Sequence, residues 1–200
     1  MRKMRQTTIL AAMVLAYASW ALAGVDMVGT VEGTVKGISG LDNTIIYVED
    51  APGEAQPGVR YMIDQKDKVY APFVLPVPAG EEVVLKNSDP ILHNVHSYAG
   101  KKTIFNWGMP IQGMELKKRF KEPGDVLVLC DVHPEMEAWI KVVPSPYYTM
   151  AGADGSFVLE GVPPGEYTVT AWHPRAKKPQ SLTVSIPVGG TAQAEFKLKK

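Results

Sequence analysis

Apolar and polar residues alternate along most of the chain after Gly24, and no stretch there repeats with a helical period. Alternation over four to eight residues is typical of half-buried β-strands. Gly- and Pro-rich turn signals, such as Asp154-Gly155 and Pro163-Pro164-Gly165, separate the alternating segments. The strands expected from this pattern are 31–35, 44–48, 83–85, 126–129, 157–159, 167–172, 182–186 and 194–198. Many short strands between closely spaced turns predict an all-β protein built from sandwiches or a barrel.

The first 23 residues follow a different pattern. Basic residues at positions 2, 3 and 5 precede an apolar stretch over 9–23, which ends in the small residues of Ala21-Leu22-Ala23. This layout predicts a secretory signal peptide cleaved near Ala23-Gly24, and therefore a periplasmic or otherwise exported protein. A retained N-terminal anchor is the alternative, although the apolar stretch is short of the roughly 20 residues of a bilayer span. No membrane span is expected in the mature chain.

Composition narrows the class of protein. The 200 residues include 18 Gly and 16 Pro, and 46% are hydrophobic, which suits a turn-rich protein with a real core. The formal net charge is zero, and three of the basic residues lie in the predicted signal peptide. The mature chain is therefore slightly acidic, so its charge offers no reason to expect a nucleic-acid partner.

The mature chain divides into two parts. The segment 55–143 contains three of the four His and the single Cys, whereas the segment 144–200 carries Asp154-Gly155-Ser156-Phe157 and Pro163-Pro164-Gly165-Glu166-Tyr167. These two motifs resemble the second half of a carboxypeptidase regulatory-like domain, a transthyretin-like β-sandwich. Residues 29–35 and 44–49 resemble the opening strand pair of the same family. The resemblance implies a smaller sandwich made of 24–54 together with 144–200 and split by an insertion, with two domains in simple tandem as the alternative.

Four side chains with metal-binding chemistry lie in the segment 55–143. His93 follows Asn87-Ser88-Asp89-Pro90, while Cys130, His133 and Met136 share one short loop after an apolar run. A thiolate, two imidazoles and a thioether form a borderline-soft set that suits a trigonal copper site with a weak axial Met. A structural zinc site needs four strong ligands, and an iron–sulfur cluster needs more thiolates than one Cys supplies. Met136 as an ordinary core residue, and a Cys130 that is merely buried, stay open as alternatives.

Residues 59–143 resemble a type 1 (blue) copper protein of the plastocyanin/amicyanin family, the cupredoxins. The resemblance rests on Cys130-Asp131-Val132-His133-Pro134-Glu135-Met136, on His93-Asn94-Val95-His96 and on the 77–87 segment. It implies a Greek-key sandwich holding one type 1 copper, with His93, Cys130 and His133 as equatorial ligands and Met136 as the axial ligand. It also implies that Asn94 braces the Cys loop and hydrogen-bonds toward the sulfur. His96 matches a residue that is not a ligand.

The function expected from this resemblance is one-electron transport between redox partners. Partners such as a dehydrogenase or a c-type cytochrome would dock near His133, and Glu135 beside it would make that surface less apolar. Four His residues are too few for the additional copper centres of the related oxidases and reductases, so no enzymatic activity is expected. A periplasmic copper-binding or delivery protein, and a non-metal β-sandwich interaction module, are the alternatives. His173, in the smaller sandwich, is expected at the surface.

Overall fold

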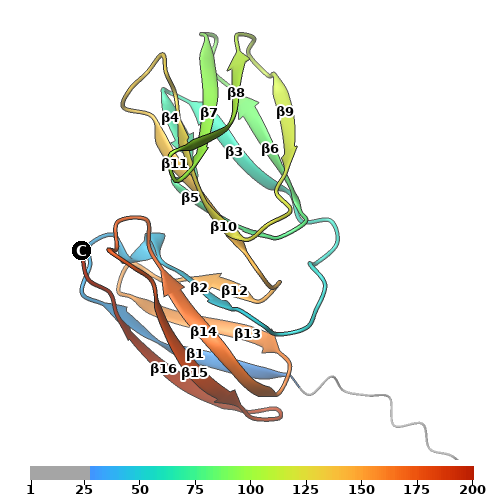
Figure 1. Cartoon of the computed structure of the whole chain (residues 1–200), viewed down its shortest axis with the longest axis vertical. Helices are drawn as coiled ribbons and strands as arrows, with labels where there is room; N and C mark the ends of the chain where they lie inside the picture. The colour runs from blue at the N-terminus through green and yellow to red at the C-terminus, as the bar shows by residue number, and fades with distance from the viewer. Residues whose placement is uncertain (1–27) are drawn as a thin grey trace, which may run out of the picture.

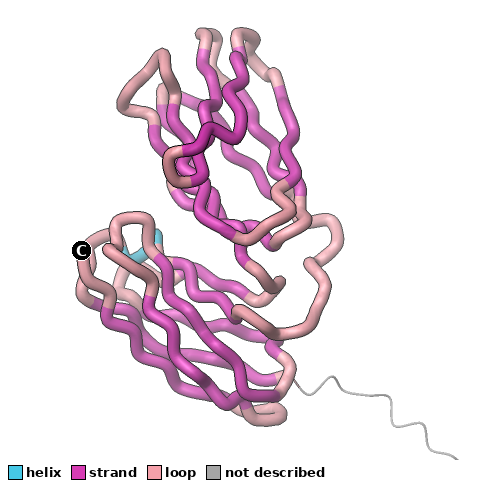
Figure 2. The backbone as a smooth tube through the Cα atoms, viewed as in Figure 1, coloured by secondary structure: helices cyan, strands magenta, loops and turns pink. Residues whose placement is uncertain are grey.

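The computed structural model describes residues 28–200, and this part of the chain is all-β apart from one short 3-10 turn, η1 (Leu41–Asn43) (Figures 1 and 2). The all-β prediction is therefore confirmed. The predicted signal peptide, 1–23, lies outside the described residues. Across residues 28–200, no helix has the length and apolar character that crossing a bilayer requires.

Residues 61–143 form the upper sandwich in Figure 1. In spatial order, one of its sheets contains β4 (Val69–Ala71), β3 (Tyr61–Lys66), β6 (Glu82–Asn87) and β9 (Glu115–Arg119). The other contains β5 (Val74–Pro78), β11 (Glu137–Val143), β10 (Gly124–Leu129), β7 (His93–Ala99) and β8 (Lys102–Met109). The apolar faces of the two sheets meet in one buried cluster, which includes Leu85, Val95, Val128 and Ile140. Burial of these alternating residues is the main contribution to the stability of the sandwich.

The lower sandwich is assembled from both ends of the described chain. One sheet has the order β13 (Ser156–Val162), β1 (Gly29–Lys36), β16 (Thr191–Lys197), and the other the order β12 (Tyr148–Met150), β2 (Ile45–Val48), β14 (Gly165–Trp172), β15 (Gln180–Ile186). β1 pairs antiparallel with β13 and parallel with β16, while β2 pairs with β12 and β14. The strands before residue 49 thus pair with strands after residue 147. Segments from both ends of the described chain therefore contribute strands to the same two sheets.

The turn that contains Gly155 shows how a local motif directs this long-range pairing. Gly155 has a φ of 84°, a conformation that Gly adopts without strain, and its N–H donates to the Gly152 carbonyl. Its own carbonyl accepts a hydrogen bond from Val35 N on β1 at 2.8 Å. A Cβ at this position would collide with the Val35 carbonyl oxygen. Gly is therefore required where the turn meets β1.

Several strands that the sequence pattern did not predict lie at sheet edges. β5 contains Pro76 and Pro78 and pairs only with β11, and an edge position is where Pro is tolerated in a sheet. β9 reads Glu-Leu-Lys-Lys-Arg and pairs only with β6. Charged residues on an edge strand discourage pairing with other molecules. Because β5 contains prolines and β9 is mostly charged, the alternation of apolar and polar residues in these two strands is weak. The sequence pattern therefore did not predict them.

The two sandwiches contact each other through an apolar cluster. Ile45, Tyr47 and Trp172 of the lower sandwich pack there with Val74 and Val143 of the upper one. Beside this cluster, Asp125 on β10 accepts hydrogen bonds from Lys141 Nζ at 2.7 Å and from Trp172 Nε1 at 3.1 Å. The ammonium of Lys141 also lies over the rings of Tyr47 and Trp172. Apolar packing and a satisfied charge together hold the sandwiches end to end.

The expectation that His173 lies at the surface is wrong. The residue follows β14 and is only 3% exposed. Its Nε2 donates to the Gly40 carbonyl at 2.9 Å, and its Nδ1 accepts from Arg175 N at 3.0 Å. A ring with one donor and one acceptor nitrogen is neutral. Burial lowers the pKa of His173, and the positive charge of Arg175 adds to this effect although the bond to Gly40 opposes it.

This burial predicts acid sensitivity of the fold. The unfolded chain binds a proton at His173 with a pKa near 6.5, more readily than the folded chain does, so lowering the pH below that value favours unfolding. We expect urea unfolding of the metal-free protein to show a stability loss between pH 7.5 and pH 5 that is smaller in His173→Asn. Identical losses in the two proteins would contradict the prediction.

Candidate metal centre

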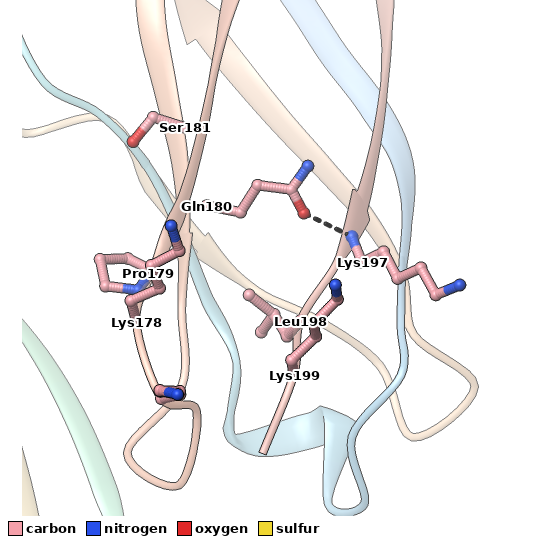
Figure 3. A pocket seen from close by; sticks show the side chains of 8 residues that line it. Lys178, Pro179, Gln180, Ser181, Lys197, Leu198 and Lys199 are labelled. Atoms are coloured by element: carbon pink, nitrogen blue, oxygen red, sulfur yellow. Dashed lines mark hydrogen bonds between the residues drawn. The ribbon is translucent and has the colours of Figure 1, made fainter.

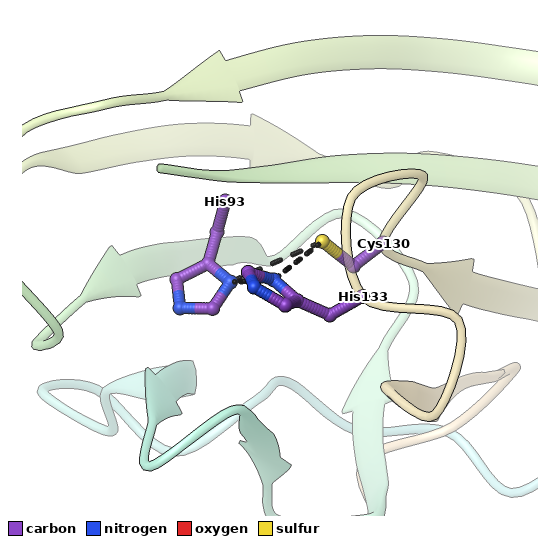
Figure 4. A group of neighbouring side chains, drawn as sticks. All are labelled: His93, Cys130 and His133. Atoms are coloured by element: carbon purple, nitrogen blue, oxygen red, sulfur yellow. Dashed lines mark hydrogen bonds between the residues drawn. The ribbon is translucent and has the colours of Figure 1, made fainter. Parts of the chain in front are cut away.

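Three potential ligand atoms, from His93, Cys130 and His133, converge beside the loop that joins β10 to β11 (Figure 4). This loop lies at the end of the upper sandwich that is remote from the lower one (Figure 1). The two imidazole Nδ1 atoms of His93 and His133 are 3.0 Å apart. Cys130 Sγ lies 3.9 Å from Nδ1 of His93 and 3.7 Å from Nδ1 of His133. Sequence reasoning selected these three residues, and the structure brings them together.

The spacing of the three atoms has a direct chemical meaning. The circle through them has a radius of about 2.1 Å, so one point is equally close to all three, at the length of a transition-metal bond to imidazole nitrogen. With both Nδ1 atoms unprotonated and the thiol ionised, as metal binding requires, the lone pairs of all three atoms would be available at this point. The arrangement therefore fits a metal ion at the centre of a trigonal ligand set.

The ligands come from one loop and one neighbouring strand. Cys130 directly follows β10, and the 130–136 loop is closed by hydrogen bonds from Met136 N to the His133 carbonyl at 3.0 Å and from Cys130 N to the Met136 carbonyl at 3.4 Å. His93 is the first residue of β7. β7 pairs antiparallel with β10, which places the start of β7 next to the end of β10.

A buried carboxylate that sequence reasoning missed holds His93 in place. Asp89 Oδ2 lies 2.8 Å from His93 Nε2, and both side chains are buried. A carboxylate only accepts here, so Nε2 donates to Asp89, and Nδ1 is the ring nitrogen that faces the other two potential ligand atoms. Asp89 also accepts from Asp67 N at 2.7 Å and Lys68 N at 3.0 Å in the β3–β4 turn. Burial alone would raise the pKa of Asp89, but these hydrogen bonds hold its pKa below the ordinary value.

Asn94 braces the ligand loop. Its Oδ1 accepts from Asp131 N at 2.7 Å, and its Nδ2 donates to the side chains of Asn106 and Asp131. The prediction that Asn94 braces the Cys loop agrees with these bonds. They go to the residue after Cys130, however, and not to the sulfur that the resemblance had implied.

Asp131 joins this brace to a second histidine. Its carboxylate accepts from Asn106 Nδ2 at 2.8 Å and lies 2.9 Å from His96 Nδ1, and the ring of His96 stacks on Tyr98. The bonds from His96 and Asn106 hold the pKa of Asp131 below its ordinary value. His96 is tied into this network on the outer side of the loop, away from the converging ligand atoms.

Met136 is the last residue of the ligand loop and is buried. Its side chain is 1% exposed and belongs to the same buried cluster as Cys130. A thioether in this position is compatible with a weak axial ligand and equally with core packing, so its role as a ligand stays a prediction.

The centre reaches the surface only at one rim, beside His133. His93 and Cys130 are buried, His133 is half-buried, and its neighbours Val132, Pro134 and Glu135 are exposed.

Comparison with protein-family profiles finds no match, and no curated protein matches the chain. Among solved structures, similarity is found to a purple cupredoxin from Nitrosopumilus maritimus, with 25% identity, a TM-score of 0.36 and coverage of 41% of this chain and 98% of that one. Amicyanin from Paracoccus versutus shows 22% identity and a TM-score of 0.38, covering 48% and 96% of the two chains.

The Cu-containing nitrite reductase from Thermus scotoductus shows 17% identity and a TM-score of 0.39 over 56% of this chain and 28% of its own. All three similarities are partial and have TM-scores below 0.5. The chemistry of the centre therefore depends on the residues of this chain: two imidazoles and one thiol converge on one point, and the buried Met136 ends the loop that carries two of them.

Proposed function

We propose that this protein binds one copper ion at His93, Cys130 and His133, with Met136 as a weak axial ligand, and that it carries single electrons between redox partners. The observation that carries the proposal is the trigonal convergence of two imidazole nitrogens and one sulfur around a point about 2.1 Å from each. A His₂Cys set with a nearby Met is the donor combination of electron-transfer copper sites.

Other metals fit the donor set less well. A structural zinc site uses four strong ligands and a catalytic zinc site keeps an open position for water, whereas this centre has three strong donors and a thioether nearby. An iron–sulfur cluster requires several thiolates, and the chain has one Cys. Soft thiolate and thioether ligands together favour copper.

The surrounding residues suit a site that changes oxidation state without changing shape. Bound copper would supply the one-electron chemistry. Asp89 fixes the tautomer of His93, while Asn94 and the closing bonds of the 130–136 loop fix Cys130 and His133. Because these side chains are held from outside the ligand set, little reorganisation would accompany electron transfer.

Electrons would enter and leave at the rim beside His133. Four exposed apolar side chains belong to the loops around this rim: Ile91, Leu92, Ile111 and Val132. The loops that carry Ile91 and Ile111 are joined by a bond from Gln112 Nε2 to the Ser88 carbonyl, and Asn87 Nδ2 binds the Ile91 carbonyl. An exposed apolar patch is typical of a protein-docking surface. The exposed Glu135 adds a charge at its margin.

The wider setting is part of the same proposal. We place the protein in the periplasm or another exported compartment, after removal of the predicted signal peptide, and assign it no enzymatic activity of its own. The upper sandwich, 55–143, would be the cupredoxin domain. The lower sandwich, 24–54 with 144–200, would be the carboxypeptidase regulatory-like part. Its nested strand pairing and the Gly155 turn support this division.

The test is a titration of the purified protein with Cu(II), followed by visible absorption and by calorimetry. We expect intense colour from thiolate-to-copper charge transfer that saturates at one equivalent, and reversible loss of the colour on reduction by one electron. A colourless protein with no heat of binding would support the non-metal interaction module instead. Tight binding with slow electron self-exchange would support copper delivery.

A further inference from the structure

The lower sandwich has a cavity of about 480 Å³ between the start of β15 and the end of β16 (Figure 3). β15 and β16 are edge strands of the two facing sheets. The cavity is lined by Lys177, Lys178, Pro179, Gln180, Ser181, Lys197, Leu198 and Lys199. Four of these eight residues are lysines.

The backbone around the cavity is held in place. Lys197 N donates to Gln180 Oε1 at 2.6 Å (Figure 3). Lys177 N donates to the Lys199 carbonyl at 2.9 Å, so two bonds bridge the ends of the strands. Leu198 is buried in the core of the sandwich and forms an apolar wall. The four lysines therefore start from fixed positions on a rigid frame, although their side chains are exposed.

The positive charge at this cavity is not neutralised. Within residues 28–200, none of the four lysines lies within 4.0 Å of a carboxylate oxygen, and the nearby Glu195 is paired with Lys36. Gathering like charges on one face is unfavourable without a counter-charge and raises the local concentration of anions. Lysines also keep free sheet edges from pairing with other molecules, but that role requires no cavity.

We propose that this cavity binds a small polyanion that carries two or more phosphate groups. Each ammonium offers three donors on a flexible stem, which suits phosphate oxygens approached from several sides. The cavity volume lies within the range of small-molecule sites. Leu198 and Pro179 add apolar surface beside the charges. The site belongs to the sandwich without the metal centre, so this proposal goes beyond the proposed function and does not depend on it.

The probes are sodium tripolyphosphate and inorganic phosphate, titrated into the full chain by calorimetry at low salt, with and without copper. We expect one site, with tripolyphosphate bound about tenfold or more tightly than phosphate, and about tenfold weaker binding when NaCl rises from 50 to 500 mM. Backbone amide signals of Lys177, Lys178, Gln180 and Ser181, and of residues 197–199, should shift. Absence of binding, or shifts elsewhere only, would overturn the proposal.

Paired variants separate a specific site from general charge. Lys178→Gln with Lys199→Gln should weaken tripolyphosphate binding about tenfold, because two of the four ammonium groups are lost. Lys101→Gln with Lys102→Gln removes the same charge from the β7–β8 turn of the other sandwich and should leave binding unchanged. Equal effects of the two pairs would contradict the proposal.

A separate experiment tests whether the phosphate groups recognised by the cavity belong to lipid headgroups. Vesicles of phosphatidylglycerol are compared with vesicles of phosphatidylcholine in a sedimentation assay. If the protein binds the anionic vesicles through Lys178 and Lys199 but does not bind tripolyphosphate, the ligand is a membrane surface and the small-molecule site is overturned. Binding of tripolyphosphate without sedimentation supports the proposal.

Discussion

Cys130→Ser is expected to abolish the visible colour of the Cu(II)-loaded protein while both sandwiches stay folded. The colour of a thiolate–copper site requires the sulfur, and a serine hydroxyl stays protonated and is a much harder ligand. Cys130 is the only sulfur among the three converging donors. Visible absorption and circular dichroism of the variant, each compared with wild type, measure the two parts of this result.

The substitution carries a structural cost that has to be separated from the loss of colour. Cys130 is buried, and a serine hydroxyl there without a full partner would lower the free energy of unfolding by about 1–3 kcal/mol. Val132→Ser, on the exposed part of the same loop, is the matched control and should keep the colour. A Cys130→Ser protein that turned as intensely coloured as wild type would exclude the sulfur from the site.

Asp89→Asn is expected to weaken copper binding by about 10- to 100-fold, the usual effect of removing a group that orients a metal ligand. Asp89 Oδ1 accepts from Asp67 N, and its Oδ2 accepts from Lys68 N and lies against His93 Nε2. Asparagine has one oxygen, so its NH₂ must face at least one of these donors. At least one donor loses its acceptor, and the uncharged amide oxygen holds His93 Nε2 more weakly than a carboxylate does, so the position of Nδ1 is less firmly enforced.

Asp67→Asn serves as the control for this prediction. Asp67 contributes a backbone N–H to the carboxylate of Asp89, and its own φ is 54°, a conformation that Asn tolerates well. The control should bind copper as wild type does. Competition with a chelator of known affinity measures both variants, and thermal unfolding of the metal-free forms reports the part of the effect that comes from the fold. Equal affinities of Asp89→Asn and wild type would exclude the orienting role.

Elements formed by residues that are close together in the sequence were predicted correctly. Strands 31–35, 126–129 and 167–172 all lie inside observed strands, because alternation reflects one buried face regardless of which strand lies alongside. The 130–136 loop belongs to the same group, since its spacing alone limits how far Cys130 and His133 can separate. Edge strands such as β9 were missed because Leu116 is the one apolar residue among its five, so no alternation is visible in the sequence.

Residues far apart in sequence needed the tertiary structure. The sequence by itself determined the all-β class, the turn at Gly155 and the chemistry of the donors, because these depend on side-chain type and local spacing. The resemblance implied that His93 meets the Cys130 loop, and the structure brings these residues together. The fold alone decided that β1 lies between β13 and β16, that Asp89 is buried against His93 and that His173 is covered. Each of these depends on which strands become neighbours, and strand neighbours are chosen by the packing of whole faces rather than by any local pattern.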